Sequence, residues 1–305
     1  MAARRTDNNG AGRRLTSADP RNANESTNGC TRAIIFAGGR GTRLAPYTSV
    51  LPKPLMPIGD RSILELVINQ LAECGIADVT LCVGYLSHLI EAVIGDGVGH
   101  GVEIRYVREE EPLGTAAPLR LVEDLDDTFI AMNGDVLTTL DYGELLRHHR
   151  EAGNVVTIAT RQRPIQIDYG VLHVRATGGV YKYIEKPQRM STVSMGIYVV
   201  EPEALAYIPT EGHFDFPDLV KALLRAQAPV GALRFEGLWF DIGRRDDYEQ
   251  AVNAWFEESM SHNGNGNGNG HAYGNGNGNG NGKVGPQHLD HETVVQMGID
   301  VDSLE

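Results

Sequence analysis

Apolar and polar residues alternate along the middle of this 305-residue chain in a pattern that predicts strands and helices in turn. Short apolar runs, as at 33–36 and 79–83, are typical of buried parallel strands. Between them, apolar residues recur at helical spacing over 63–71, and Cys74-Gly75 then provides a natural helix end. Strand, helix and strand in succession predict an α/β fold with a parallel sheet.

The same pattern predicts further elements as far as residue 258. In the first half we expect strands at 102–107 and 129–132 and helices at 86–94, 118–122 and 141–151. In the second half we expect strands at 155–160, 170–174, 180–184, 195–200, 230–235 and 238–243, and helices at 214–227 and 246–258. So many strands indicate antiparallel or mixed pairing, packed beside the first half with a groove between the two.

Both ends of the chain differ in composition from the middle. Residues 1–29 are rich in Asn, Arg, Ser and Gly, and residues 263–282 are nearly all alternating Asn and Gly. Neither segment can bury enough apolar surface to offset the entropy lost on ordering. We therefore predict a disordered arm over 1–29, one folded domain over 30–260, and a low-complexity tail with a short acidic end over 261–305.

The formal charge of the chain is −13, of which the predicted domain carries −11. Nucleic acids and anionic membranes need an extended basic face, so we expect neither as a partner. No apolar run approaches membrane length, and no signal sequence is evident, which favours a cytoplasmic protein. The cysteines at 30, 74 and 82 lack metal-ligand spacing and are expected to be mainly buried thiols. The sequence leaves a homo-oligomer open.

A glycine-rich segment with added cations follows the first predicted strand. Residues 37–44 read AGGRGTRL, and a Pro-Lys-Pro-Leu run follows at 52–55. Glycine lets peptide N–H groups converge and lets a polyanion approach the backbone, while the two arginines and Lys53 add positive charge. We predict that this segment cradles a triphosphate. It is neither a Walker loop, which needs Gly-Lys-Ser/Thr, nor a dinucleotide fingerprint, which needs a small residue where Leu44 stands.

Two aspartates follow or end predicted strands. Asp135 comes after 129–132 in the run Asn-Gly-Asp, and Asp241 ends an apolar run that begins at Leu238. Ligand crevices form at the carboxyl ends of parallel strands, and Mg²⁺ usually takes one or two carboxylates plus phosphate oxygens. Asp135 is therefore either a metal ligand or a turn residue. A metal partner would also explain Asp241, which would be costly to bury unpaired.

Three acids at 109–111 precede the run Pro-Leu-Gly-Thr-Ala at 112–116. Their charge alone would indicate a solvated loop, but the loop follows the carboxyl end of a predicted strand, where ligands bind.

Two histidines near the end of the predicted helix 141–151 carry no chemistry in this interpretation. His148 and His149 are adjacent, so their side chains point in different directions and cannot chelate one ion together. We expect both on the surface, where a cation near a helix C-terminus is favourable.

Taken in order, these motifs resemble those of the sugar-1-phosphate nucleotidylyltransferases. The glycine segment and its Pro-Lys-Pro-Leu run are similar to the N-terminal motif of that family, and residues 112–116 are similar to mannose-1-phosphate guanylyltransferases in particular. Residues 239–243 match a Trp-x-Asp-Ile-Gly motif. The resemblance covers about residues 32–256 and implies a Rossmann-like nucleotide-diphospho-sugar transferase fold, with a mixed central sheet flanked by helices.

The resemblance also implies a reaction and its residues. A nucleoside triphosphate and a sugar 1-phosphate would give a nucleotide sugar and pyrophosphate, with Mg²⁺ held by Asp135 and Asp241. The implied catalytic residues are Arg43, Lys53 and Asp135. The implied nucleotide-binding residues are Ala37, Gly38, Gly39, Gly41, Thr42, Arg43, Glu111 and Gly114. The implied sugar-binding residues are Tyr169, Gly170, Glu185, Lys186, Ser194, Gly196 and Trp239.

Three choices stay open at this point. In the resembled family the loop at 109–116 reads the base, and a carboxylate at Glu111 could accept from guanine N1–H and the exocyclic amine together, whereas uracil and thymine offer one imide N–H. GTP is therefore the favoured nucleotide, with UTP or dTTP as the alternative. Family members commonly carry Asn where this chain has Ser194, so the acceptor could be a hexose, heptose, amino sugar or cyclitol phosphate. A catalytically silent, nucleotide-sugar-binding regulatory subunit is the alternative from another class, and the presence of both cations and both aspartates disfavours it.

Overall fold

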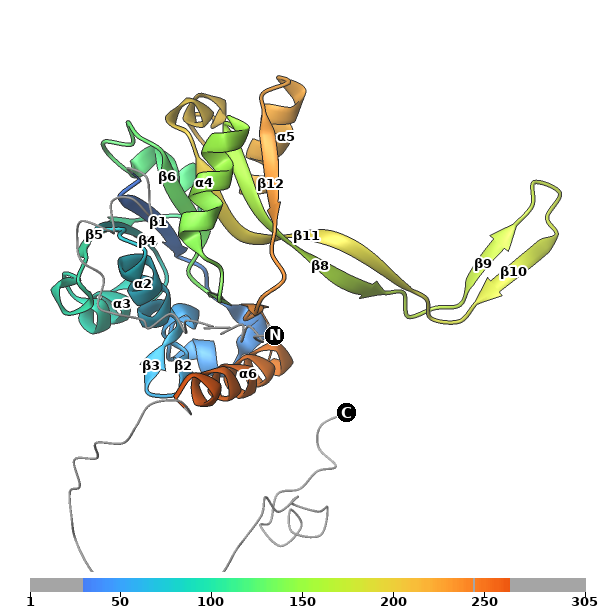
Figure 1. Cartoon of the computed structure of the whole chain (residues 1–305), viewed down its shortest axis with the longest axis horizontal. Helices are drawn as coiled ribbons and strands as arrows, with labels where there is room; N and C mark the ends of the chain where they lie inside the picture. Colours follow the sequence, from blue (N-terminus) through green and yellow to red (C-terminus); the bar gives the residue numbers. More distant parts are fainter. Residues whose placement is uncertain (1–29, 244, 264–305) are drawn as a thin grey trace, which may run out of the picture. The chain divides into compact units, whose positions relative to one another are not determined.

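The computed structural model describes residues 30–243 and 245–263, so the predictions for 1–29 and for most of 261–305 lie outside the described residues. A seven-stranded sheet in the order β12-β8-β11-β6-β1-β4-β5 forms its centre (Figure 1). The strands are β1 (Arg32–Ala37), β4 (Asp78–Val83), β5 (Glu103–Arg108), β6 (Phe129–Asn133), β8 (Val156–Gln166), β11 (Gln188–Val200) and β12 (Val230–Arg234).

All strands of this sheet run in one direction except β11. β1 pairs in parallel with β4 and β6, β4 pairs in parallel with β5, and β12 pairs in parallel with β8. β11 lies antiparallel between β6 and β8. The chain runs outward from β1 to β5 and then returns to the other side of β1, and ligands bind outside the carboxyl ends of strands at such a reversal. The predicted mixed sheet is confirmed.

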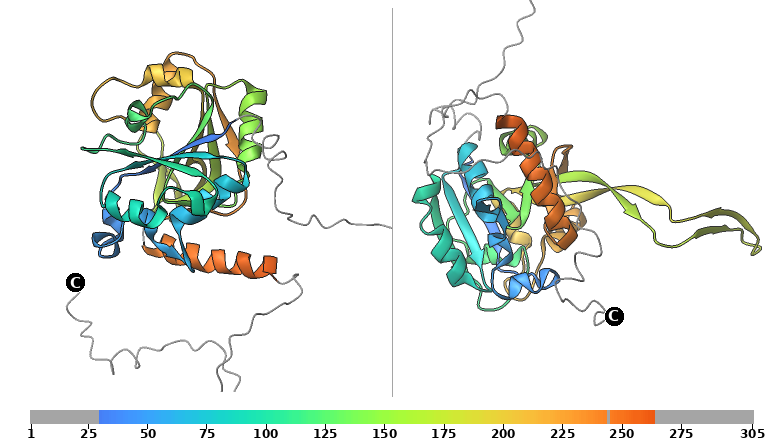
Figure 2. Two further views of the ribbon diagram at one scale, coloured as in Figure 1. Left: turned by 90° about the vertical axis from the view of Figure 1, so that its left-hand side faces the viewer. Right: turned by 90° about the horizontal axis from the view of Figure 1, so that it is seen from below.

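Helices lie on both sides of the sheet (Figure 2). They are α2 (Ile63–Glu73), α3 (Ser87–Ile94), α4 (Tyr142–Ala152), α5 (Phe216–Arg225) and α6 (Arg245–Asn263). Because successive strand residues face opposite sides, Ile35 joins the apolar cluster that contains Leu64 of α2, whereas Ile34 joins a second cluster with Phe216 of α5. The sheet is thus buried on both faces, as its continuous apolar runs predicted.

Three predicted elements differ from the observed ones. The helix expected at 118–122 is a 3₁₀ turn (Ala117–Leu121) with Pro118 near its start. β8 and β11 extend well beyond the apolar stretches that predicted them, because they pair with each other from Gln166 opposite Gln188 to Thr160 opposite Ser194. Backbone pairing between two polar strands leaves no periodic apolar signal in the sequence.

The outer parts of β8 and β11, with the residues between them, form an arm that we define as residues 161–193. At its end, β9 (Val171–Val174) and β10 (Val180–Ile184) form an antiparallel hairpin that projects away from the central sheet (Figure 1). The expected second half beside a groove is therefore not observed, because β8, β11 and β12 join the central sheet and only the hairpin stands apart.

Two short ladders complete the described fold. β2 (Pro57–Ile58) pairs with β3 (Arg61–Ser62), and β7 (Val136–Thr138) pairs with β13 (Trp239–Asp241).

None of the described helices is both long and apolar enough to cross a membrane. The three cysteines are free thiols, two of them buried, and burial raises the pKa of Cys30 to about 11.

The prediction that His149 lies on the surface is wrong. Its side chain is 1% exposed, with Nδ1 2.8 Å from the Thr157 hydroxyl and Nε2 2.9 Å from Glu201 Oε1. Both partners lie on strands of the central sheet or at their ends, so local spacing on the helix could not reveal them. Burial lowers the pKa of His149, although the hydrogen bond to Glu201 opposes this shift.

We expect acid to weaken the wild-type fold more than that of a His149→Gln variant. Because the pKa of His149 is lower when folded than its ordinary value of 6.5, the unfolded chain binds this proton more readily. The contribution of His149 to the free energy of unfolding is therefore complete above pH 6.5. Below pH 6.5 it falls by at most about 1.4 kcal/mol per pH unit.

Urea unfolding at pH 7.5 and pH 5.0 measures this effect. The stability of wild type relative to His149→Gln should fall at the lower pH, while His148→Gln should follow wild type because His148 is not one of the buried groups. A constant difference between wild type and His149→Gln at the two pH values would contradict the prediction.

Candidate functional site

A cleft of about 320 Å³ opens at the carboxyl edge of the sheet, where β1 and β6 end. Its size is at the lower end of the range of ligand pockets, about 300 to 1,000 Å³. Segments after β1, β5 and β6 contribute most of the lining, which consists of Phe36, Ala37, Gly38, Gly39, Gly41, Arg43, Lys53, Pro54, Glu109, Pro112, Gly114, Thr115, Asn133, Asp135 and His213.

The glycine segment brings its backbone close to the acidic loop. A Cβ atom on Gly38 would lie 2.6 Å from Glu109 Oε1, so a larger residue would displace this carboxylate. Among the described residues, no atom beyond Gly39 and its two chain neighbours lies within 4 Å of the Cβ position at Gly39, so the cleft is open there. Thr42, also predicted to bind nucleotide, is exposed and lines a neighbouring hollow with Tyr85 instead of the cleft.

Lys53 joins the two aspartates that the sequence singled out. Its side chain is 9% exposed, and its ammonium contacts Asp135 Oδ2 and lies 3.8 Å from Asp241 Oδ1. The pairing of β7 with β13 brings the two carboxylates together, since Asp241 lies opposite Val136 and the Ile242 N–H donates to the Asp135 carbonyl at 3.2 Å. Two acids that are distant in sequence therefore share one cation.

The charges around Asp241 act in opposite directions. Partial burial and the Asp135 carboxylate raise the pKa of Asp241, while Lys53 and Arg43 oppose this rise. Arg43 lies beside the same segment, because its Nη1 is 3.8 Å from the Cβ position at Gly243. The arrangement brings two cations and two carboxylates together beside the cleft, which Arg43, Lys53 and Asp135 line and Asp241 does not.

Asp135 retains an unsatisfied oxygen. Its Oδ1 is buried and has no hydrogen-bond partner among the described residues, which is unfavourable for a carboxylate unless a ligand supplies one. No group of three or more His, Cys, Asp or Glu that could hold a metal ion is found within the described residues. Asp135 and Asp241 alone could hold a divalent cation only with oxygens from a substrate or water.

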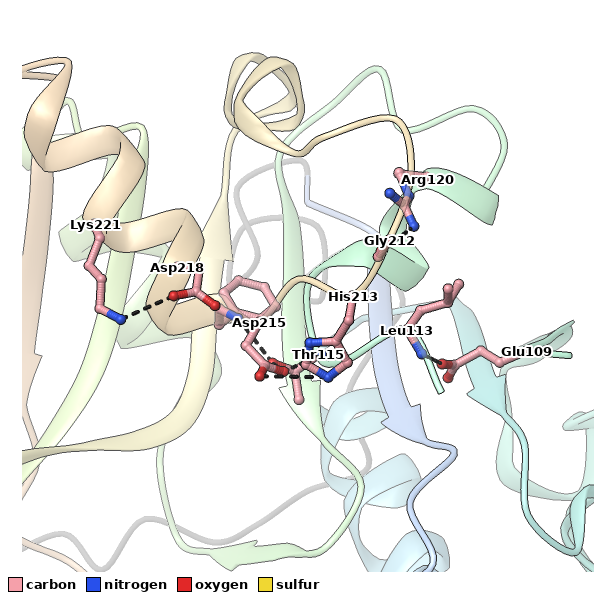
Figure 3. Close-up of polar contacts among 10 residues, drawn as sticks. Glu109, Leu113, Thr115, Arg120, Gly212, His213, Asp215, Asp218 and Lys221 are labelled. Atoms are coloured by element: carbon pink, nitrogen blue, oxygen red, sulfur yellow. Dashed lines mark hydrogen bonds and ion pairs between the residues drawn. The ribbon is translucent and has the colours of Figure 1, made fainter. Parts of the chain in front are cut away.

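The loop after β5 is fixed by a segment about 100 residues further along the chain (Figure 3). The Thr115 N–H donates to Asp215 Oδ1 at 2.9 Å, and the Phe214 N–H donates to the Leu113 carbonyl at 2.8 Å. Gly114 has φ +95°, and a Cβ there would lie 2.7 Å from the Phe214 carbonyl oxygen. Sequence analysis missed Thr115, His213 and Asp215, because only long-range pairing gives them a role.

Glu109, and not Glu111, is the acid of this loop that lines the cleft. Glu109 Oε2 accepts from the Leu113 N–H at 3.1 Å (Figure 3), and burial raises the pKa of its carboxyl group. Glu111 is exposed and lines the adjacent hollow with Arg40 and Tyr85. Sequence spacing alone could not show which of two acids, two residues apart in an irregular loop, faces the cleft.

The residues predicted to bind the sugar fall into two groups. Near the cleft, Trp239 Nε1 donates to the Met195 carbonyl at 3.1 Å, and a Cβ on Gly196 would lie 2.5 Å from the amide of Asn133, which lines the cleft. The Ser194 hydroxyl accepts from the Gly196 N–H at 3.2 Å. The other group consists of Tyr169, Gly170, Glu185 and Lys186 on the arm. None of the seven predicted sugar-binding residues lines the cleft itself.

Comparison of the sequence with known proteins shows the family to which the chain belongs. The family model for nucleotidyl transferases matches residues 32–258. A UTP–glucose-1-phosphate uridylyltransferase from Synechocystis is 34% identical over 73% of this chain and 63% of its own length. A mannose-1-phosphate guanyltransferase from Yarrowia lipolytica is 33% identical over 71% of this chain and 62% of its own length. The chain thus spans less than two thirds of the length of these curated relatives.

Solved structures share the fold. HddC from Yersinia pseudotuberculosis, complexed with GMP-PN, has a TM-score of 0.55 and 24% identity over 74% of this chain and 99% of its own. A Bacillus anthracis protein assigned to the glucose-1-phosphate thymidylyltransferases has a TM-score of 0.60 and 24% identity, over 73% of this chain and 94% of its own. Both confirm the predicted nucleotide-diphospho-sugar transferase fold.

We expect the ion pair between Lys53 and Asp135 to couple strongly to folding. Lys53→Met should destabilise the protein by about 1 to 3 kcal/mol, because it leaves two neighbouring carboxylates without their cation. Adding Asp135→Asn should restore part of that loss, which gives an interaction free energy of about 1 to 3 kcal/mol in a double-mutant cycle measured by urea unfolding.

The exposed pair Lys221–Asp218 provides the matched control. Its atoms are 3.0 Å apart with side chains 60% and 45% exposed, and such pairs contribute about 0 to 1 kcal/mol. If the cycle with Lys221→Met and Asp218→Asn gives the same interaction free energy as the cleft pair, then Lys53 does not hold the two carboxylates together in the way described.

Proposed function

The chain belongs to the nucleotidyl transferase family, and we propose that it transfers the nucleotidyl group of a nucleoside triphosphate to a sugar 1-phosphate, releasing pyrophosphate. One observation carries this proposal. The glycine segment, Arg43, Lys53 and the two carboxylates meet at the carboxyl edge of the sheet, where the winding of the chain reverses. Converging backbone, fixed cations and a cation-binding acid pair suit a substrate with several phosphates.

The proposed chemistry is in-line attack by an oxygen of the sugar phosphate on the α-phosphorus of the nucleotide. A bond forms between that oxygen and the α-phosphorus as the bond to the bridging oxygen breaks, and pyrophosphate leaves with the electron pair. A phosphate monoester has a second pKa of about 6, so the attacking oxygen is already deprotonated near neutral pH and no general base is needed. The tasks left to the protein are alignment and charge neutralisation.

In this proposal Arg43 and Lys53 stabilise the charge on the transferred group and on the leaving pyrophosphate. Both line the cleft beside the open backbone at Gly39. Asp135 and Asp241 would hold Mg²⁺, a fit supported by the unsatisfied Oδ1 of Asp135 and by the preference of Mg²⁺ for one or two carboxylates with phosphate oxygens. When bound, the metal would supply charge neutralisation between the phosphates of the two substrates.

We propose guanine as the base, and assign its recognition to Glu109. Its carboxylate faces the cleft beside Gly38, and it could accept from guanine N1–H and the 2-amino group together. The guanyltransferase relatives and the nucleotide in the HddC complex are consistent with this choice, whereas the uridylyltransferase relative favours UTP as the alternative.

We expect GTP, Mg²⁺ and a pool of sugar 1-phosphates to release pyrophosphate in the presence of the protein, and a chelator to abolish the release. GTP, UTP, CTP, ATP and dTTP should be compared in parallel. Release with another nucleotide would keep the reaction and overturn the proposed base. The sugar is then identified by testing the members of the pool one at a time.

The same assay tests the assigned residues. Asp135→Asn and Arg43→Ala should each reduce kcat/KM roughly 30- to 1,000-fold, which corresponds to a loss of about 2 to 4 kcal/mol of transition-state stabilisation. Arg120→Ala is the matched control, because Arg120 donates to the carbonyls of Pro209 and Gly212 and does not line the cleft. Normal turnover in Asp135→Asn or Arg43→Ala would remove that residue from the mechanism.

Substitutions of Glu109 and Glu111 show which of the two carboxylates recognises the base. A glutamine at 109 offers one acceptor and one donor, which suits the imide face of uracil or thymine better than guanine. Glu109→Gln should therefore shift the ratio of kcat/KM for GTP over UTP by about 10- to 100-fold toward UTP, the discrimination of one paired contact. Glu111→Gln should leave that ratio unchanged. If Glu111→Gln shifts the ratio and Glu109→Gln does not, then Glu111 is the residue that recognises the base.

A further inference from the structure

One imidazole at the cleft has no part in the reaction proposed above. Among the described residues, His213 is the only histidine that lines the cleft, and it comes just before Phe214 and Asp215, which lead into α5. Its side chain is 58% exposed, so a bound ligand can reach it. The proposed reaction assigns the phosphates and the metal to other side chains, which leaves His213 without a role.

The backbone next to His213 is held by the loop after β5. The Phe214 N–H donates to the Leu113 carbonyl at 2.8 Å, and the Phe214 carbonyl accepts from the N–H groups of Ala116 and Ala117, both at 3.0 Å. These three hydrogen bonds attach the segment to the wall of the cleft. A side chain on a backbone that is already ordered loses less entropy when it binds a ligand, and this favours binding.

The ring of His213 lies against Gly114, which is among the residues predicted to bind nucleotide. A Cβ atom on Gly114 would lie 3.0 Å from His213 Cε1. His213 Nε2 is 3.9 Å from Asp215 Oδ2, while Asp215 Oδ1 accepts from the Thr115 N–H (Figure 3). The Nδ1 atom has no hydrogen bond among the described residues, so this nitrogen is left for a ligand.

The strand order gives His213 a place along the cleft. β1 and β4 lie between β6, which precedes Asp135, and β5, which precedes Glu109. The segment of His213 packs over β1, because the ring centres of Phe216 and Phe36 are 5.7 Å apart. In the proposed function the phosphates lie toward Asp135 and the base lies at Glu109. The ribose joins the two and therefore lies between them, where His213 stands.

We propose that His213 holds the ribose of the nucleotide through a hydrogen bond between Nδ1 and one of the two ribose hydroxyls. A hydroxyl both donates and accepts, so it can pair with either tautomer of the imidazole. The inference rests on the proposed function for the direction in which the nucleotide lies, but it does not depend on the identity of the base. It also concerns the choice of nucleotide, because dTTP lacks a 2′-hydroxyl.

Equilibrium binding tests this contact without any turnover. GTP, 2′-deoxy-GTP and 3′-deoxy-GTP are titrated calorimetrically into the full chain with Mg²⁺ and no sugar phosphate, and the uridine series replaces them if UTP is the nucleotide that binds. One of the two deoxynucleotides should bind wild type about 3- to 10-fold more weakly than the parent nucleotide, the effect of one hydrogen bond.

The His213→Ala variant completes a cycle with the missing hydroxyl. The parent nucleotide should bind this variant about 3- to 10-fold more weakly than it binds wild type. Removing the hydroxyl should then change binding by less than about twofold, because the partner of the hydroxyl is already absent. The exposed ring contributes little to the core, so the variant should unfold in urea as wild type does.

Two further variants separate a hydrogen bond from a change of shape. His213→Asn keeps a polar atom near the position of Nδ1, so the weaker binding of the deoxynucleotide should persist in part, at about threefold. His88→Ala is the matched control, because His88 is exposed on α3 and does not line the cleft. It should show the full effect of the missing hydroxyl.

The outcomes separate this inference from the proposed function. If both deoxynucleotides bind wild type as tightly as the parent nucleotide, or if the effect of the hydroxyl persists in His213→Ala, then His213 does not hold the ribose. Either result together with release of pyrophosphate by wild type would leave the proposed function standing. A folded wild type that binds none of these nucleotides would instead overturn the proposed function and the role of His213 together.

Discussion

The ammonium of Lys53, held between Asp135 and Asp241, is the interaction on which the cleft depends. Two carboxylates at the edge of one sheet repel each other, and without a cation the pairing of β7 with β13 would have to work against that repulsion. The ion pair thus connects the end of the central sheet to the last strand of the domain. Asp135 Oδ1 has no hydrogen-bond partner among the described residues, and the proposed function would give it one in a bound metal ion.

The nucleotide half of the fold could be predicted because its signals are local. Each buried parallel strand is a short apolar run, and each α-helix carries its own periodicity, so the order of the central strands and of α2 and α3 as far as β6 follows from the sequence. Eight of the residues assigned to nucleotide, catalysis or metal line the cleft for the same reason, since they sit in contiguous motifs. The resemblance of these motifs to one family is confirmed by the match over residues 32–258.

What could not be predicted depends on contacts between distant residues. His149 has its partners on the sheet, and Thr115 meets Asp215 from a different part of the chain. Whether Glu109 or Glu111 faces the cleft depends on how an irregular loop turns, and the spacing of residues in the sequence does not show this. The two strands of the hairpin were predicted, but the outer parts of β8 and β11 were missed because their hydrogen bonding continues where the apolar pattern stops. The separation of the arm from the body is a property of the fold and not of any motif.

The attachment of the loop after β5 limits the kinds of sequence change that this part of the cleft can accept. The backbone of residues 113–116 is tied to residues 214–216, and Gly114 has no room for a side chain, so insertions or deletions in this loop would disturb both segments. If Glu109 recognises the base as proposed, a single side-chain replacement there could change the preferred nucleotide without any change in loop length. The rigid backbone would then keep the rest of the cleft in place while its chemistry changes at one position.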